Sequence, residues 1–286
     1  MSQRVAIVGA GPAGLAAAVA VLCEGLQAYV IAPEFGGRMA ASPRIENILG
    51  FPLGIDGEDF NVRAIEQVER LGGIFVKATA AHVIDWPTQP IPFDVRLDNG
   101  TVSANAVILA TGMTPTAPTE CEASPGHDGY HVVVGGGDAA VQVALGSAGR
   151  GVKTILAVRG DSLDRCTEYL RARAQADPRL TTRFNTVAID KGNGNIALGP
   201  TGTAPKLILR NSTLQVLIGA EPKTSWADVN VDARGFVETD LKFMTSRDGV
   251  FAAGDVRAGT IKRVNVAAGE GLAVGHIVAN WLKEQK

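Results

Sequence analysis

Short apolar runs alternate with glycine-rich loops and alanine-rich segments along much of the chain. Near the start, the apolar run Val5–Val8 leads into glycines at positions 9, 11 and 14, an alanine-rich segment from Leu15 to Cys23, and a second apolar run, Ala28–Ala32. Runs of about four to eight apolar residues bounded by glycine are typical of buried strands. This stretch therefore predicts a strand, a loop, a helix and a second strand, the unit from which parallel α/β sheets are built.

The same pattern returns after residue 130. Its strand, G-x-G-x-x-A loop, helix and second strand cover His131–Val134, Gly135–Ala140, Asp138–Ala148 and Thr154–Val158. Such a loop between a strand and a helix is the fingerprint of a dinucleotide-binding fold. Two of these units predict two bound dinucleotides, and the usual pair is a flavin dinucleotide with a nicotinamide dinucleotide.

Each glycine of the first loop has a separate expected role. Gly9 allows a tight turn, Gly11 lets the backbone approach a pyrophosphate, and Gly14 lets the helix pack closely on the strand. The helix that follows presents free N–H groups and a partial positive charge to the phosphates. We therefore expect these glycines to bind a pyrophosphate, and the alternative is a tight turn without a ligand.

One charged residue follows the second strand of each unit. Glu34 lies close to the place where an acidic residue would hold ribose hydroxyls, and Arg159 lies where an arginine would meet the 2′-phosphate of NADPH. Arg159 thus favours NADPH over NADH. The alternatives are a solvated loop carboxylate for Glu34 and an ordinary surface arginine for Arg159.

Composition narrows the class of protein. The 286 residues are 46% hydrophobic and 20% charged, with a net charge of −2, so no basic field would attract nucleic acid or an anionic membrane. No run reaches the about 18 apolar residues of a membrane span. Cys23, Cys121 and Cys166 lie far apart, which indicates neither a disulfide framework nor a metal site. We expect a cytoplasmic enzyme.

Five further motifs make the chain similar to a known family. Ala110–Gly112 (ATG) and Phe251–Val256 (FAAGDV) resemble the flavin motifs of two-dinucleotide-binding-domain flavoproteins. Gly36–Arg38 (GGR), Arg44–Pro52 (RIENILGFP) and Lys262–Gly271 (KRVNVAAGEG) are similar to segments of the low-molecular-weight thioredoxin reductases. The resemblance covers nearly the whole chain.

This resemblance implies an α/β fold of two Rossmann-like dinucleotide-binding domains, in which the FAD domain is split by an inserted NAD(P) domain. The FAD domain would comprise residues 1–114 and 220–286, and the NAD(P) domain residues 115–219. The crossovers near Met113–Pro118 and Gly219–Pro222 would act as hinges. The family also implies a homodimer.

The resemblance and the glycine loops together assign the cofactor-binding residues. Those expected to bind FAD are Gly9, Gly11, Pro12, Ala13, Gly14, Glu34, Gly37, Arg38, Asn47, Thr111, Gly112, Gly254, Asp255, Arg263, Val264 and Asn265. Those expected to bind NADPH or NADH are Gly135, Gly137, Asp138, Ala139 and Arg159. Arg38 stands where the family usually has glutamine, a change of polarity beside the flavin.

The main departure from the family is the missing C-x-x-C before the second glycine loop, where only Cys121 remains. A dithiol relay needs an attacking thiolate and a resolving partner. We expect Cys23 to pack as a small apolar residue in the first helix, and Cys166 lies in a predicted helix of the second domain. Electrons are therefore expected to leave reduced FAD directly.

No Ser-His-Asp or paired-carboxylate pattern stands out, and the four histidines (His82, His127, His131 and His276) are scattered. Catalysis is therefore assigned to FAD itself.

Three hypotheses about the function follow. The first is an NAD(P)H-dependent oxidoreductase with an external acceptor, which is a small redox protein such as ferredoxin or flavodoxin, a quinone or dioxygen. The second is a disulfide reductase that uses Cys121, and the third is a flavin-binding sensor module with a vestigial nicotinamide domain.

Overall fold

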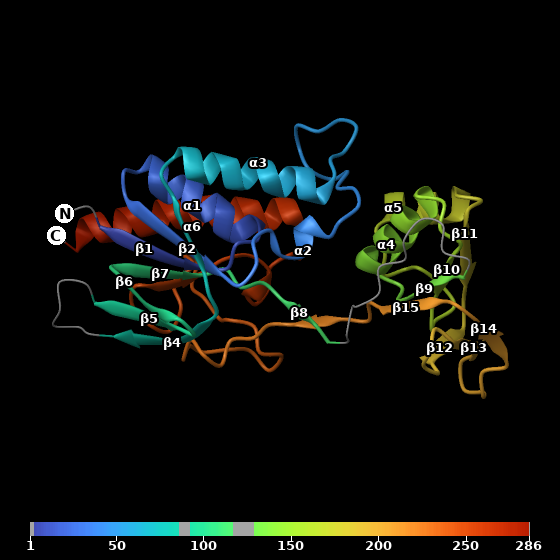
Figure 1. The fold of residues 1–286 in the computed structure, drawn as a ribbon. Coiled ribbons are helices and arrows are strands. Elements are labelled where there is room, and N and C mark those ends of the chain that lie inside the picture. The colour runs from blue at the N-terminus through green and yellow to red at the C-terminus, as the bar shows by residue number, and fades with distance from the viewer. Residues whose placement is uncertain (1–2, 86–91, 117–128, 286) are drawn as a thin grey trace. The chain divides into compact units, whose positions relative to one another are not determined.

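The chain forms two compact units in the computed structural model, which describes residues 3–85, 92–116 and 129–285 (Figure 1). The first unit comprises Met1–Ala41, Ile45–Thr114 and Glu221–Lys286, and the second comprises Ser42–Arg44 and Pro115–Ala220. Apart from Ser42–Arg44, the second unit is thus an insertion between Thr114 and Glu221 of the first.

A five-stranded parallel sheet forms the centre of the first unit, with strands in the order β17, β7, β1, β2, β3. In chain order these strands are β1 (Arg4–Val8), β2 (Gln27–Ala32), β3 (Ile74–Lys77), β7 (Ala106–Leu109) and β17 (Val250–Ala252). The strands are apolar on both faces, as expected where both faces of a parallel sheet are covered.

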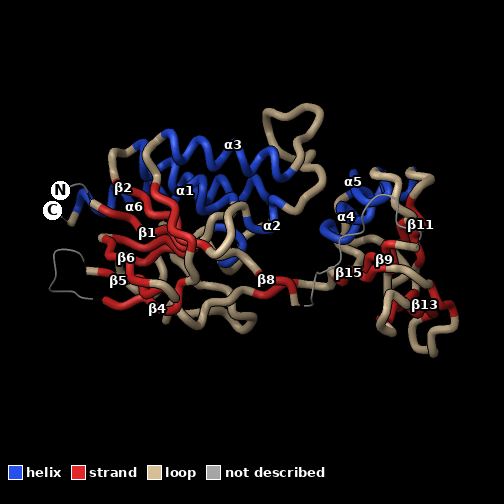
Figure 2. The backbone as a smooth tube through the Cα atoms, in the orientation of Figure 1, coloured by secondary structure: helices blue, strands red, loops and turns tan. Residues whose placement is uncertain are grey.

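Helices cover one face of this sheet and a small antiparallel sheet covers the other (Figure 2). The helices that pack on the sheet are α1 (Pro12–Cys23), α3 (Gly57–Arg70) and α6 (Val264–Glu284). The unit also contains the short helix α2 (Gly37–Ala40) and a 3₁₀ turn, η1, at Gly254–Val256. The antiparallel strands are β4 (Ala80–Asp85), β5 (Phe93–Leu97) and β6 (Gly100–Ala104). Alternation along β1 divides the two cores, because Val5 and Ile7 face the helices and Ala6 and Val8 face the opposite side.

The second unit repeats this plan with four parallel strands in the order β11, β10, β9, β15. These strands are β9 (His131–Val134), β10 (Thr154–Ala157), β11 (Leu180–Arg183) and β15 (Thr213–Val216). One face packs against α4 (Asp138–Gly149) and α5 (Glu168–Ala176). The other packs against the antiparallel strands β12 (Thr186–Asp190), β13 (Ile196–Pro200) and β14 (Leu207–Leu209).

Two short strands lie where the chain passes between the units. These are β8 (Thr114–Pro115) and β16 (Ala220–Glu221), which form a two-stranded sheet. The Thr116 N–H also donates to the Gly219 carbonyl, at 3.2 Å. The two crossover segments therefore run side by side.

The elements predicted around both glycine loops are confirmed, and four details differ. Cys166, expected in a helix, lies in the turn that precedes α5. The apolar run Val250–Asp255 predicts a strand that ends in Gly-Asp, but β17 ends at Ala252 because Gly254 takes φ of +78° and starts η1. The alanine- and glycine-rich segment from about Val264 to Trp281 predicts the last helix, and α6 continues to Glu284. Cys23 is exposed at the end of α1, so the prediction that it packs as an apolar residue is wrong.

The first residue of β9 is a buried histidine. His131 is 2% exposed, and its Nδ1 lies 2.8 Å from the hydroxyl of Ser147, which is fully buried in α4. Burial lowers the pKa of His131 below its ordinary value of 6.5. The folded protein therefore binds a proton at this site less readily than the unfolded chain does.

This burial predicts a loss of stability in mild acid. The unfolded chain takes up the proton first, so the free energy of unfolding falls as the pH drops below about 6.5. We expect His131→Gln to flatten this dependence between about pH 7.5 and about pH 5.5, measured by urea unfolding. His82→Gln, at an exposed position of β4, should keep the wild-type slope. Equal slopes in wild type and His131→Gln would contradict the assignment.

Candidate functional site

The first glycine loop joins β1 to α1 and has little room for side chains. Gly9 takes φ of +114°, and a Cβ there would lie 2.2 Å from the Ala110 carbonyl oxygen. A Cβ on Gly14 would lie 1.8 Å from the Gly9 carbonyl oxygen. At Gly11, which caps α1, no described protein atom would lie within 4 Å of an added Cβ. The loop thus packs tightly against the protein backbone at Gly9 and Gly14, and it leaves space for a ligand at Gly11, at the N-terminus of α1.

The second unit repeats this geometry at corresponding positions. Gly135 takes φ of +148°, and a Cβ there would lie 2.4 Å from the Leu217 carbonyl oxygen. Gly137 caps α4 and, like Gly11, has no described atom within 4 Å of an added Cβ. Ala140 takes the place of the third glycine and is buried. Both loops leave a helix N-terminus open.

The other residues expected at the nicotinamide site surround this second loop. Asp138 and Ala139 form the first turn of α4, and the Asp138 Oδ1 accepts the N–H of Thr167 at 2.7 Å. Arg159 is exposed two residues beyond the end of β10. Because β9 and β10 are parallel neighbours, Arg159 lies at the same edge of the sheet as the glycine loop.

A half-buried carboxylate, that of Asp255, stands beside the first loop, in the turn after β17. Asp255 Oδ2 lies 3.5 Å from Arg38 Nη1, and its Oδ1 is buried without a hydrogen-bond partner among the described residues. Burial raises the pKa of Asp255, while the charges of Arg38 and Lys262 oppose that rise. The Thr111 hydroxyl is likewise buried without a described partner. Both oxygens are free to bind a polar ligand.

Helix α2 packs against the open side of the same loop. The Gly36 N–H donates to the Ala10 carbonyl at 2.8 Å, and a Cβ on Gly37 would lie 3.3 Å from the Gly11 Cα. Gly37 and Arg38 thereby come within reach of a ligand held at Gly11.

The remaining residues expected at the flavin lie around the start of α6. Arg263 is the N-cap of this helix, and Val264 packs against Met39 and its apolar neighbours. The Asn265 side chain donates a hydrogen bond to the Asn47 carbonyl. Glu34 is exposed just beyond β2. Gly112, with φ of +64°, follows Thr111 after β7.

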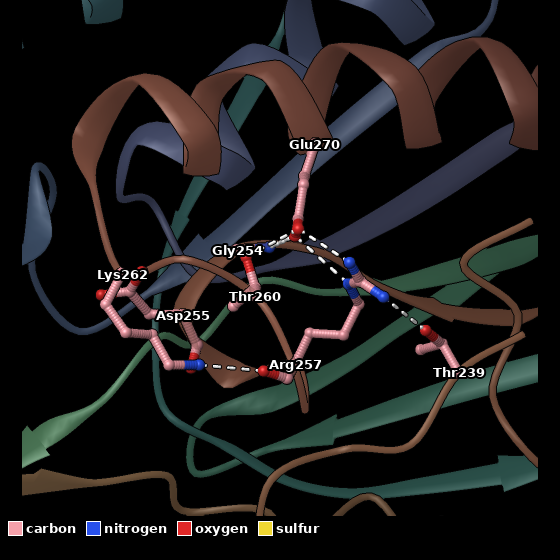
Figure 3. Close-up of polar contacts among 7 residues, drawn as sticks. All are labelled: Thr239, Gly254, Asp255, Arg257, Thr260, Lys262 and Glu270. Atoms are coloured by element: carbon pink, nitrogen blue, oxygen red, sulfur yellow. Dashed lines mark hydrogen bonds and ion pairs between the residues drawn. The ribbon is translucent and has the colours of Figure 1, made fainter. Parts of the chain in front are cut away.

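Sequence reasoning missed one polar network in this unit, which Figure 3 shows. The carboxylate of Glu270, on α6, accepts hydrogen bonds from the Gly254 N–H, the Arg257 guanidinium and the Thr260 hydroxyl. Lys262 Nζ donates to the Asp255 and Arg257 carbonyls. A glutamate between two glycines of an apolar helix was the one available signal.

These features fit a dinucleotide in the first unit. A helix N-terminus without a side-chain cap attracts phosphate, and the Gly11 position leaves space there. The unpartnered oxygens of Asp255 and Thr111 suit hydroxyl and amide groups of a ligand such as FAD. Among the described residues, no group of three or more His, Cys, Asp or Glu side chains is arranged to hold a metal ion. None of the described helices is long and apolar enough to span a membrane.

Two alanine substitutions should separate binding from folding. Gly11→Ala meets no described atom, so we expect unchanged urea unfolding of the apoprotein but about tenfold weaker FAD binding, because the methyl group enters the phosphate space. Gly14→Ala meets the Gly9 carbonyl and should destabilise the apoprotein by about 3 kcal/mol. Wild-type FAD affinity in Gly11→Ala would show that the ligand lies elsewhere.

Comparison with known proteins agrees with this geometry. The family described as pyridine nucleotide-disulphide oxidoreductase matches residues 3–132 and 129–271. The thioredoxin reductase of Neurospora crassa is 30% identical over 322 residues, which cover 100% of this chain and 95% of that protein. Thioredoxin reductase 1 of Saccharomyces cerevisiae is 30% identical over 309 residues, covering 94% of each chain.

A solved structure supports the fold. The thioredoxin reductase of Lactococcus lactis, in its FR conformation, matches with a TM-score of 0.84 at 22% identity, covering 99% of this chain and 100% of that one. The two Rossmann-like domains predicted from the sequence are thus confirmed. FAD and NADPH, the cofactors expected at the two loops, are those of the thioredoxin reductases. The chain belongs to the pyridine nucleotide-disulphide oxidoreductase family and is an oxidoreductase of thioredoxin reductase type.

Proposed function

We propose that this chain takes hydride from NADPH and passes electrons from its flavin directly to an external acceptor, without a C-x-x-C relay. The observation that carries the proposal is the placement of its cysteines at positions 23, 121 and 166, no two of which form a C-x-x-C. Thiol–disulfide exchange needs an attacking thiolate and a resolving partner. The chain therefore has no C-x-x-C dithiol that could accept the electrons from reduced flavin.

The two cysteines that the structure describes are poorly placed for such a relay. Cys23 ends α1, whereas Gly11 caps its start, and 12 helical residues span about 18 Å. Cys166 is buried in the apolar core of the second unit, next to Leu163 and Leu170. Cys121 and His127 lie outside the described residues. Cys121 is therefore the one thiol on which a disulfide mechanism would depend.

The chain's own residues bind and orient in this proposal. The open N-terminus of α1 at Gly11 would hold the FAD pyrophosphate, and Asp255 and Thr111 would accept or donate hydrogen bonds to its polar groups. Arg159 would meet the 2′-phosphate of NADPH beyond β10. Bound FAD supplies the two-electron carrier between NADPH and the acceptor. No acid or base residue is required of the protein for hydride transfer.

The proposed acceptor is a small redox protein such as ferredoxin or flavodoxin, a quinone or dioxygen. A cytoplasmic homodimer belongs to the same proposal. The second candidate is a disulfide reductase that uses Cys121, which the names of the curated relatives favour. The third is a flavin-binding sensor module in which NADPH does not reach the flavin.

Removal of all three cysteines separates these functions. We expect Cys23→Ser/Cys121→Ser/Cys166→Ser to bleach its flavin with NADPH and to reduce a quinone at a rate within about twofold of wild type. Cys23→Ser alone, at an exposed position outside the cofactor loops, is the matched control for serine substitution. Loss of turnover only when Cys121 is replaced would favour the disulfide reductase. A flavin that dithionite bleaches and NADPH does not would favour the sensor module.

A further inference from the structure

A single carboxylate holds the turn that follows β17. Glu270 is the seventh residue of α6, and four donors meet its two oxygens (Figure 3). Oε2 accepts the Gly254 N–H at 2.7 Å and Arg257 Nε at 3.3 Å. Oε1 accepts Arg257 Nη2 at 2.8 Å and the Thr260 hydroxyl at 2.7 Å. Three points of the segment 254–260 are thereby attached to one side chain.

The Glu270–Arg257 pair is largely removed from solvent. The side chains are 11% and 21% exposed, respectively, whereas those of the pair Glu24–Lys283 are 29% and 56% exposed. Burial alone would raise the pKa of Glu270, but hydrogen bonds from Arg257, Thr260 and the Gly254 N–H outweigh it and leave that pKa below its usual range. The carboxylate is therefore an ion at neutral pH, and its charge is neutralised by Arg257.

Two aromatic rings and a lysine complete the attachment of this turn. The Arg257 guanidinium lies 4.7 Å from the centroid of the Phe243 ring, and Lys262 Nζ lies 4.1 Å from that of Phe236. The same Lys262 Nζ donates to the carbonyls of Asp255 and Arg257, at 2.8 Å and 2.9 Å. Cation–π contacts and charge-assisted hydrogen bonds of this kind restrict the backbone on both sides of Asp255.

The turn itself has little freedom of its own. Gly254 takes φ of +78°, and a Cβ there would lie 2.6 Å from the Ala13 side chain. The Ala253 N–H makes the last sheet hydrogen bond, to the Leu109 carbonyl at 3.0 Å. The next backbone donor, the Gly254 N–H, has Glu270 as its partner. Asp255 is the next residue, so the hydrogen bond between Gly254 and Glu270 constrains the direction of the Asp255 side chain.

We propose that Glu270 is a positioning residue of the FAD site, which acts by fixing the Gly254–Asp255 turn so that the Asp255 carboxylate faces the bound cofactor. The inference rests on the proposed function, since it takes FAD as the dinucleotide of the first unit. A glutamine at 270 keeps the size of the side chain but replaces one acceptor oxygen by an N–H donor. That donor would face the donors of Arg257, Thr260 or Gly254, and the turn would loosen.

A second glutamate, between helices α1 and α6, provides a matched control for Glu270. Glu24, which follows α1, accepts Lys283 Nζ at 2.9 Å and lies 3.1 Å from the His276 ring, both on α6. This cluster joins α1 to α6 without touching the Gly254–Asp255 turn. Glu24→Gln therefore removes a helix-to-helix charge contact and leaves the cofactor turn unchanged.

The test is FAD binding by the full-length apoprotein, followed by flavin fluorescence, for Glu270→Gln, Glu24→Gln, Asp255→Asn and the double variant Glu270→Gln/Asp255→Asn. We expect Glu270→Gln to weaken FAD binding about tenfold and Glu24→Gln to change it less than about twofold. Asp255→Asn alone should weaken FAD binding about tenfold. In the Glu270→Gln background it should weaken binding by less than about a further threefold, because both substitutions disrupt the same interaction between Asp255 and FAD. Thr260→Val, which removes one donor and uncovers no charge, should weaken binding about threefold.

Each outcome decides between the two proposals. An unchanged FAD affinity in Glu270→Gln and Thr260→Val, or a full effect of Asp255→Asn in both backgrounds, would overturn the positioning role and leave the proposed function intact. If Glu270→Gln does not fold, Thr260→Val alone decides in the same way. A wild-type apoprotein that does not bind FAD would overturn the proposed function and this inference together.

Discussion

Helices α1 and α6 pack with their backbones in close contact, and the candidate cofactor site of the first unit depends on that contact. A Cβ on Gly271 would lie 2.1 Å from the Ala13 carbonyl oxygen, and one on Gly275 would lie 2.5 Å from the Ala20 side chain. Only glycine permits such contact, because any side chain would separate the helices. The contact brings the last helix, and the turn that precedes it, beside the loop at the start of the chain. The ends of a 286-residue sequence are thereby joined into one site.

The glycine loops of the two units have the same backbone geometry but different neighbouring side chains. In each, a glycine with positive φ follows the first strand and lies against a carbonyl of the neighbouring strand's end, that of Ala110 or Leu217. Each loop also leaves an open helix N-terminus, at Gly11 and Gly137. The groups around these termini then distinguish the sites. The half-buried carboxylate of Asp255 and the neighbouring cation Arg38 lie at the first, whereas an exposed arginine follows β10 at the second.

Local sequence patterns predicted the parts of the fold that depend on neighbouring residues. Glycine spacing and apolar runs were sufficient for β1, α1, β9 and α4, since these elements form from contiguous residues. Glu270, Arg257 and Thr260 were not predicted as a group, because their contact depends on how α6 packs across the sheet. The exposure of Cys23 was missed for a similar reason, since composition does not say which side of the last helical turn faces solvent. The motif around Asp255 predicted a cofactor-binding residue, but it gave no indication of the side chains that contact this turn.

The claim that reduced flavin donates directly can be tested by counting electrons. An anaerobic dithionite titration of the FAD-loaded chain, followed by flavin absorbance and by thiol content, measures how many electrons the protein accepts per FAD. Direct donation by the flavin predicts an end point of about two electrons per FAD, with no new thiols, because FAD would be the one group in the protein that accepts electrons. An end point of about four electrons, with two thiols released, would reveal a reducible disulfide and contradict it.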